Sequence, residues 1–421
     1  MATPDLAVLP APESKTPAQA DVSPAPSSSP AFAGRFYFPE LDAVRIFLFF
    51  GVWSYHTLPR DASFFLAHHF PSVLASCITT AIKACMCSLD VFFILSAFLI
   101  TELLLRERAL KASVDLKAFY SRRLLRIWPL YFFMIALAVL FTRFDHSQTF
   151  GWNYVLSFLL FTGNWVMVFR GFPRATFIGP LWSVSFEEQF YLLWPLVLRR
   201  ASMQTIRNIA FALLLVASAA RFILLLRHVG GDSLWYNSFA RLDSIALGIL
   251  LAVVFHGRST FRFGLPVRIV LLLLGISAWM LVGHYCGLLD PIPTLAGGMI
   301  GYPLMSLGGA AIFLCVLGAA RDGLSFLRNP LLVYLGKISY GLYAFHLLAL
   351  RLSSNLFSEY HHPFRQTLSW LCALGITFLL AVVSFRWLET PFLRWKQKSF
   401  TYVPSGAPSW VAPGSTAEPP A

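Results

Sequence analysis

Residues 269–288 read IVLLLLGISAWMLVGHYCGL and contain no Asp, Glu, Lys or Arg. A helix of about 20 residues is about 30 Å long, which matches the hydrocarbon core of a bilayer. The sequence therefore predicts an all-α protein, a polytopic transmembrane helical bundle of about ten spans. The other nine apolar runs that could cross are 41–58, 87–105, 127–142, 181–198, 208–226, 242–255, 298–319, 332–350 and 367–388.

The composition supports a membrane protein and excludes other classes. The 421 residues are 57% hydrophobic and 13% charged, whereas soluble domains carry about 25% charged residues. The net charge of +13 does not indicate nucleic-acid binding, because membrane proteins gather Lys and Arg on their cytoplasmic loops. The six Cys residues form no CxxC pair and no Cys/His spacing typical of a metal site. We therefore expect buried thiols and no bound metal.

The two ends of the chain differ in composition from the rest. Residues 1–34 contain seven Pro among Ala and Ser, and residues 399–421 are similarly rich in Pro, Gly, Ser and Ala. Neither end can bury enough apolar surface to offset the entropy of ordering. We expect two disordered tails around a membrane domain at residues 35–398. No basic start leads into an apolar stretch before residue 40, so no signal peptide is expected.

Charge decides the topology around a further apolar run at residues 153–169. Counting it as a span would place the three arginines of residues 199–207 outside and invert every later loop. Short loops rich in Lys and Arg tend to stay cytoplasmic. Without this span the basic loops, including residues 106–126 with seven Lys and Arg, all lie inside. We therefore predict that residues 144–180 form a re-entrant or outer hairpin and that both termini are cytoplasmic.

The first span carries two ionisable residues on one face. Arg45 and His56 are eleven residues apart, so in a helix they lie only about 20° apart around the axis and about 16 Å apart along it. Arg45 can hold an anion near the inner end, and His56 can move a proton near the outer end. The alternative is that Arg45 reaches the inner headgroups and His56 hydrogen-bonds a neighbouring helix.

The run LWSVSFEEQFYLLWP places Glu187 and Glu188 inside an apolar helix. Adjacent helical residues point about 100° apart, so the two cannot face one cavity equally. One of them can carry a proton or orient an imidazole, and the alternative is pairing with an Arg of another span. A basic run beside the third span contains Arg122, Arg123 and Arg126, and it fits lipid headgroups as well as a phosphate ligand.

Several other motifs are weaker. Charged or polar residues in or at the ends of later spans are more often helix-end charges or packed polar groups than catalysts, namely Arg241, Asp243, His346, Arg386 and Glu389. Residues 231–234 spell the GDSL of a family of serine esterases, but no α/β domain surrounds them. The pairs at 68–69 and 361–362 are His-His pairs in outer loops without further ligands, so no metal site is predicted.

Together these segments form a familiar order of motifs. Residues 37–395 resemble the membrane acyltransferase 3 family, whose members O-acylate surface polysaccharides, lipopolysaccharide, macrolides and other extracytoplasmic acceptors. The resemblance begins with LDAVR and ten residues between Arg45 and His56. It continues through SLDVFFILSAFLIT at 88–101, FYSRRLLRIWP at 119–129, LWSVSFEEQFYLLWP at 181–195, RLDSIALG at 241–248, LGKISYGLYAFH at 335–346 and SFRWLETPF at 384–392.

The resemblance implies a donor, an acceptor and roles for site residues. The donor is an acyl-CoA, in most members acetyl-CoA, which binds from the cytoplasm without any other cofactor. Arg45 would receive its phosphates, helped by the three arginines of residues 122–126. His56 would act as general base or carry the acyl group covalently, while Glu187, supported by Glu188, would fix its tautomer. The acceptor would be a carbohydrate or a lipid-linked molecule, and the protein would lie in a bacterial inner membrane.

Two departures from the family pattern and one rival function are evident. Ala43 and Ala97 stand where the family has Gly, so we expect slightly wider helix contacts there. No hydrolase-like domain follows the last span, so a stand-alone core is expected. The rival class is a proton-coupled transporter or lipid flippase without covalent chemistry, although no inverted repeat relates the two halves. A purely structural membrane protein would leave the buried charges unexplained.

Overall fold

A computed structural model describes residues 37–144, 151–173, 176–257, 263–319, 324–360 and 364–399. Within these ranges the chain forms helices and no β-strand, so the predicted all-α class is confirmed. The predicted tail at residues 1–34 lies outside the described residues. Of the predicted tail at 399–421 only Ser399 is described, and it ends the last helix.

The first half of the chain begins with a helix of 19 residues and continues into a nearly unbroken run of helix over residues 72–111. Its helices are α1 (Pro39–Thr57), α2 (Ala62–Ala67), α3 (Ser72–Ala84), α4 (Ser88–Lys111), α5 (Leu116–Phe144), α6 (Trp152–Leu159), α7 (Gly163–Arg170), α8 (Trp182–Leu198) and α9 (Met203–Leu226).

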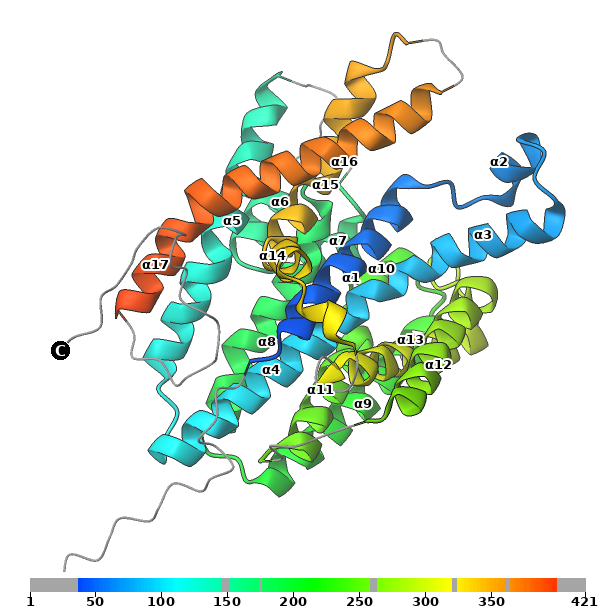
Figure 1. Cartoon of the computed structure of the whole chain (residues 1–421). Coiled ribbons are helices and arrows are strands. Elements are labelled where there is room, and N and C mark those ends of the chain that lie inside the picture. The colour runs from blue at the N-terminus through cyan, green and yellow to red at the C-terminus, as the bar shows by residue number, and fades with distance from the viewer. Residues whose placement is uncertain are drawn as a thin grey trace, which may run out of the picture.

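The second half contains two π-helical turns in addition to its helices, Val282–Cys286 and Phe385–Glu389. Figure 1 shows α1 and α4 near the middle of the bundle, with α16 and α17 along one side and α9, α12 and α13 along another. The helices of this half are α10 (Gly231–Tyr236), α11 (Leu242–Phe255), α12 (Leu265–Leu281), α13 (Leu295–Val316), α14 (Pro330–Lys337), α15 (Ser339–Leu356), α16 (Arg365–Ser384) and α17 (Thr390–Ser399).

Fewer helices are long and apolar enough to cross a membrane than the ten runs suggest. Among the described residues 6 helices qualify, or 7 if α14 and α15, bent by 63°, count as one broken span. All of them coincide with predicted runs. The remaining three runs also form helices, but α8 has 17 residues, α11 has 14, and α1 begins with charged residues. The membrane-spanning class is therefore established, while ten spans remain a prediction.

The outward surface of these helices is apolar, as a lipid environment requires. Leu215 of α9 is 72% exposed, Leu274 of α12 is 59% exposed and Leu379 of α16 is 63% exposed. In water such surfaces would be an aggregation hazard, whereas in hydrocarbon they carry no cost. These three helices therefore form part of the lipid-facing wall of the bundle.

The run at 153–169 does not form one continuous helix. It divides into α6 and α7, of 8 residues each, and each is only about 12 Å long. Phe161, between them, has a positive φ of 54°, which interrupts the helical path. Neither helix can cross about 30 Å of hydrocarbon alone. This geometry agrees with leaving the segment out of the spans.

Close helix contacts persist at the two positions where alanine stands in the motifs. A Cβ on Gly248 of α11 would lie 2.7 Å from the Cβ of Ala97 on α4, and a Cβ on Gly336 of α14 would lie 1.7 Å from the carbonyl oxygen of Asp42, next to Ala43 on α1. Each glycine therefore allows a close approach from the facing helix. The expected widening at Ala43 and Ala97 is offset by these facing glycines.

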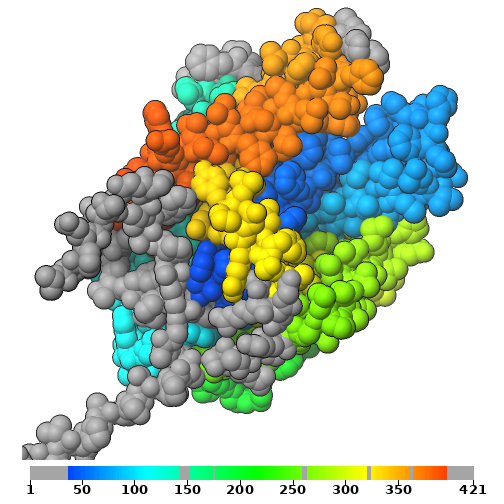
Figure 2. Space-filling view, viewed as in Figure 1, coloured from blue at the N-terminus to red at the C-terminus, as the bar shows by residue number. Residues whose placement is uncertain are grey.

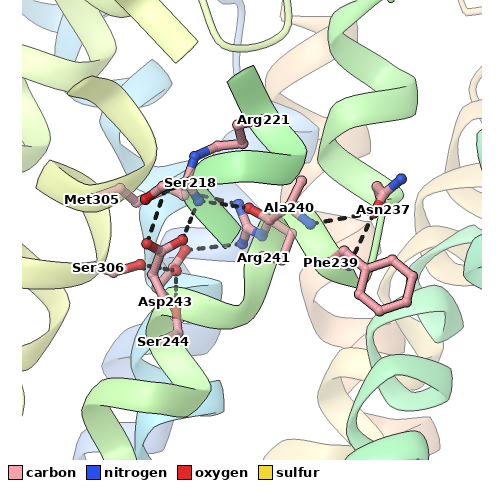
Figure 3. Close-up of polar contacts among 11 residues, drawn as sticks. Ser218, Arg221, Asn237, Phe239, Ala240, Arg241, Asp243, Ser244, Met305 and Ser306 are labelled. Atoms are coloured by element: carbon pink, nitrogen blue, oxygen red, sulfur yellow. Dashed lines mark hydrogen bonds and ion pairs between the residues drawn. The ribbon is translucent and has the colours of Figure 1, made fainter. Parts of the chain in front are cut away.

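A buried network of charges holds four helices of the bundle together (Figure 3). Asp90 of α4 accepts hydrogen bonds from Arg241 at 3.0 Å, from Ser306 of α13 at 3.0 Å and from Ser244 of α11. Arg221 of α9 pairs with the next acidic residue, Asp243. Because these charges satisfy one another, they join the helices without leaving an isolated charge in the apolar interior.

Candidate active site

A cavity of about 360 Å³ opens beside the first half of α1. Its walls come from α1, α4, α5, α8, α14 and α15, and from the chain around the π-helical turn at Phe385–Glu389. Figure 2 shows α14 on this face of the molecule, beside the dark blue residues of α1. Among apolar residues, the wall also contains polar side chains: Tyr37, Asp42, Arg45, Ser96, Arg123, Arg126, Ser183, Glu187, Tyr191, Lys337, Ser339, Tyr340, Tyr343 and Glu389.

Arg45 lines this cavity, and part of its guanidinium is already bound. Its Nη1 donates to Oδ1 of Asp42 at 2.6 Å, while Tyr37 donates its hydroxyl to the other carboxylate oxygen at 2.9 Å. Both members of the ion pair are largely shielded from solvent. Asp42 therefore holds Arg45 in place, and the rest of the planar fork remains available to an anionic ligand.

The three arginines of α5 divide between two environments. Arg123 and Arg126 line the cavity, and the guanidinium of Arg123 lies 5.1 Å from the ring centroid of Tyr191. Arg122 points elsewhere and donates to the buried Glu107 of α4 at 3.4 Å. The predicted phosphate-binding set thus has two of its three α5 members at the cavity, and Arg122 links α4 to α5 instead.

Glu187 also lines the cavity, at a place fixed by two hydroxyl groups. Ser96 donates to one carboxylate oxygen at 3.1 Å and Tyr191 donates to the other at 2.7 Å. Glu188 points away from the cavity, where it accepts from Trp128 at 3.4 Å. As the 100° step between neighbours predicts, only one of the two faces the cavity. No hydrogen bond between either carboxylate and His56 is found among the described residues.

Several cavity residues carry no distinct signal in the sequence. Ser183 and Tyr343 both donate to the carbonyl oxygen of Pro180, at 3.1 and 2.8 Å, and their oxygens lie 2.8 Å apart. Lys337 adds a cation, and Glu389, which the sequence indicated only as a charge at the end of a span, adds a carboxylate. Each stands in a motif that the resemblance covers, but a single hydroxyl or charge in an apolar helix does not reveal which cavity it faces.

His56 lies at the other end of α1, about 16 Å along the axis from Arg45. Its side chain is exposed, and its ring centroid lies 5.2 Å from that of the buried His346 on α15. The His346 ring in turn lies 5.7 Å from the ring of Tyr343, which reaches the cavity. The two imidazoles therefore stand just beyond the cavity wall, on the side away from Arg45.

The remaining sequence candidates are structural or exposed. Arg241 and Asp243 belong to the buried network, and Arg386 is exposed. The GDSL segment forms α10, where Ser233 donates to the carbonyl oxygen of Val168 at 3.0 Å. No group of three or more His, Cys, Asp or Glu residues in the described ranges could hold a metal ion. Of the two His pairs, the one at 361–362 lies outside these ranges.

Comparison with known proteins gives a consistent result. A family model described as "Acyltransferase domain" matches residues 38–386. O-acetyltransferase OatA of Staphylococcus aureus strain NCTC 8325 is 26% identical over 383 residues, which are 87% of this chain and 59% of that protein. A second relative, named "Putative O-acetyltransferase SACOL0978" in S. aureus strain COL, is 24% identical over 394 residues, which are 89% of this chain and 60% of that protein. The chain thus spans about three fifths of these relatives, and no solved structure matches it.

Proposed function

Because the chain belongs to the acyltransferase 3 family, we propose that it transfers an acyl group, foremost acetyl, from a cytoplasmic acyl-CoA to a hydroxyl group outside the membrane. Its similarity to OatA, named as an O-acetyltransferase, supports acetyl transfer to oxygen. The acceptor would be a carbohydrate or a lipid-linked sugar. The enzyme would lie in a bacterial inner membrane with both termini in the cytoplasm, as the charge distribution of its loops suggests.

The observation that carries this proposal is the placement of the charges relative to the two imidazoles. The cavity gathers four cations, Arg45, Arg123, Arg126 and Lys337, while His56 and His346 lie beyond its far wall. A donor with a polyanionic head and a reactive thioester at the end of a long arm suits this arrangement. The phosphates would bind the cations through charge-assisted hydrogen bonds, and the thioester would reach toward Tyr343.

The chemistry follows from the groups at that end. The acceptor hydroxyl would attack the thioester carbonyl while His56 takes its proton, so that a C–O bond forms. The C–S bond then breaks, and the proton passes from His56 to the leaving CoA thiolate. The hydroxyls of Ser183 and Tyr343 lie near the path of the thioester, and either could donate to the developing oxyanion if its O–H turned away from the Pro180 carbonyl oxygen. The products are an acyl ester and CoA thiol, and the enzyme returns unchanged.

A covalent route through acyl-His56 uses the same residues. The imidazole would attack the thioester first, release CoA thiol, and then pass the acyl group to the acceptor hydroxyl. Incubation with labelled acyl-CoA without acceptor, followed by acid quenching, separates the two routes. Label retained on the protein, and lost on adding acceptor, supports the covalent route, whereas direct transfer leaves the protein unlabelled.

The test of the proposed function is thiol release. Purified protein in nanodiscs is incubated with labelled acetyl-CoA and an extract of envelope glycans, and free CoA thiol and labelled ester are both measured. Production of thiol and ester in equal amounts by the parent, and not by His56→Ala, supports the proposal. The rival transporter or flippase would leave thiol at background in both proteins, and that result would refute the proposal.

A further inference from the structure

The surroundings of His346 fix the tautomer of its neutral ring. Its side chain is fully buried in α15, and its Nδ1 lies 2.6 Å from the carbonyl oxygen of Tyr343. A carbonyl oxygen only accepts hydrogen bonds, so Nδ1 carries the hydrogen. In the neutral ring Nε2 is then a bare acceptor, and it is buried without a hydrogen-bond partner among the described residues. Buried polar atoms in proteins are nearly always hydrogen-bonded, so an acceptor buried without a partner indicates that another group can bind it.

The nearest ring to His346 on another helix is that of His56. The centroids of the two imidazoles are 5.2 Å apart and the ring planes are tilted by 46°. A ring nitrogen lies about 1.1 Å from its centroid, so two nitrogens pointing at each other would be about 3 Å apart, the length of a hydrogen bond. A turn of the exposed His56 ring that keeps this separation would let one of its nitrogens donate to Nε2 of His346.

Other groups near the pair do not take this place. Tyr55 contacts His56 edge to face at 5.3 Å, and Arg60 lies over the Tyr55 ring at 4.6 Å. A guanidinium cannot accept a hydrogen bond, and the ring face of Tyr55 that lies beside the imidazole is a weaker acceptor than a nitrogen lone pair. The carboxylate of Glu187 is bound by hydroxyls in the cavity instead. His346 thus offers His56 a buried ring nitrogen that has no other hydrogen-bond partner among the described residues.

We propose that His346 is a positioning residue for His56. Nε2 of His346 accepts the N–H of His56, which leaves the other nitrogen of His56 unprotonated and aimed at the acceptor hydroxyl. When His56 takes the acceptor's proton, the same hydrogen bond stabilises the imidazolium, and no net proton moves to His346. The arrangement resembles a base oriented by a third group, with a neutral imidazole in place of a carboxylate. This inference rests on the proposed function.

Two substitutions of His346 separate positioning from packing. His346→Asn retains a group where Nδ1 stands, so it keeps the bond to the Tyr343 carbonyl but lacks an acceptor toward His56. His346→Gln places an amide oxygen near the position of Nε2 and keeps that acceptor. We expect Asn to lower kcat at saturating donor and acceptor by about 10- to 100-fold, within the range of general-base catalysis. Gln should stay within about threefold of the parent, and KM for the donor should change little in both.

The opposite order would overturn the inference. A packing role predicts that Asn, which keeps the buried bond, is the more active variant, and equal losses in Asn and Gln would also contradict positioning. If Asn does not fold, His346→Leu replaces it, because Leu and Gln both lack the Tyr343 bond and only Gln carries an acceptor. A parent protein that releases no CoA thiol would refute the proposed function itself. An active parent with Gln no better than Asn or Leu would refute the positioning role alone.

Discussion

Replacing Arg45 with Lys should weaken use of the donor while leaving use of the acceptor nearly unchanged. Arg45 lines the cavity and gives one nitrogen of its fork to Asp42 at 2.6 Å. The remaining side of the fork can bind a phosphate with fixed geometry. Lys keeps the charge, but its single ammonium would have to serve both the carboxylate and the phosphate. The change therefore removes a directed hydrogen bond rather than the positive field.

The size of the effect follows from that one bond. A hydrogen bond to a charged group contributes about 1.5–3 kcal/mol, and the retained charge of Lys recovers part of this. A net loss of about 1.4 kcal/mol corresponds to a tenfold change in an equilibrium constant. We therefore expect the apparent KM for acyl-CoA to rise about tenfold. Because the reacting groups lie about 16 Å away along α1, kcat at saturating donor should stay within about threefold.

Steady-state kinetics in nanodiscs, varying each substrate in turn, measure both effects. Arg207→Lys is the matched control, since Arg207 is an exposed residue of α9 that does not line the cavity. It should leave both KM values unchanged. An unchanged donor KM in Arg45→Lys, or a change confined to the acceptor, would contradict the assignment of this end of α1 to the donor. Arg123 and Arg126 would then become the leading phosphate ligands.

Three further predictions address the base, the network and the topology. His56→Ala should lower kcat by at least about 100-fold without changing the thermal midpoint in detergent, since an exposed base is lost; transfer within a few fold of the parent would identify another base. Asp90→Ala should cost about 3–5 kcal/mol of unfolding free energy because it leaves Arg241 unpaired, and a loss below about 1 kcal/mol would contradict this. Residues 258–262, which lie outside the described residues, should form a cytoplasmic loop, so a Cys placed there should resist an impermeant thiol reagent in intact cells. A Cys in place of Pro291 should react with the same reagent. The reverse labelling pattern would mean an eleventh span.

The sequence predicts the fold class well because apolar run length is a local property. Each predicted run becomes helical, although the run at 332–350 divides into α14 and α15, and the runs near residues 208–226 and 269–288 are long enough to span alone. The number of crossings is harder to predict, since α8 and α11 are short and depend on neighbours for burial. No local pattern shows whether such a helix crosses the bilayer or ends within the bundle.

Helical periodicity predicts which side chains of one helix share a face, and this part of the candidate site could be predicted from the sequence. Spacing alone indicated that one of Glu187 and Glu188 would face a cavity, and the structure identifies Glu187. It could not show that Arg122 turns toward Glu107, because that partner comes from another helix. For the same reason His346 looked like a packed polar group in the sequence. Its proposed role depends on a contact with His56, which lies 290 positions away on another helix. The sequence of one helix cannot reveal such a contact.

The carboxylates of the cavity have a further consequence for turnover. Asp42, Glu187 and Glu389 stand among the four cations, so the side chains of the cavity do not add up to a large uncompensated charge, which would be costly in an apolar surrounding. A polyanionic donor would then compete with Asp42 for Arg45 and would be repelled by the carboxylates of Glu187 and Glu389. Both effects would weaken the binding of the proposed donor and of CoA alike, whereas tight binding of both would slow product release without accelerating the chemistry. Glu187→Gln should therefore lower KM for acyl-CoA and strengthen inhibition by free CoA. Measuring the inhibition constant of CoA in parent and variant checks this, and an unchanged constant would show that the carboxylate does not moderate donor binding.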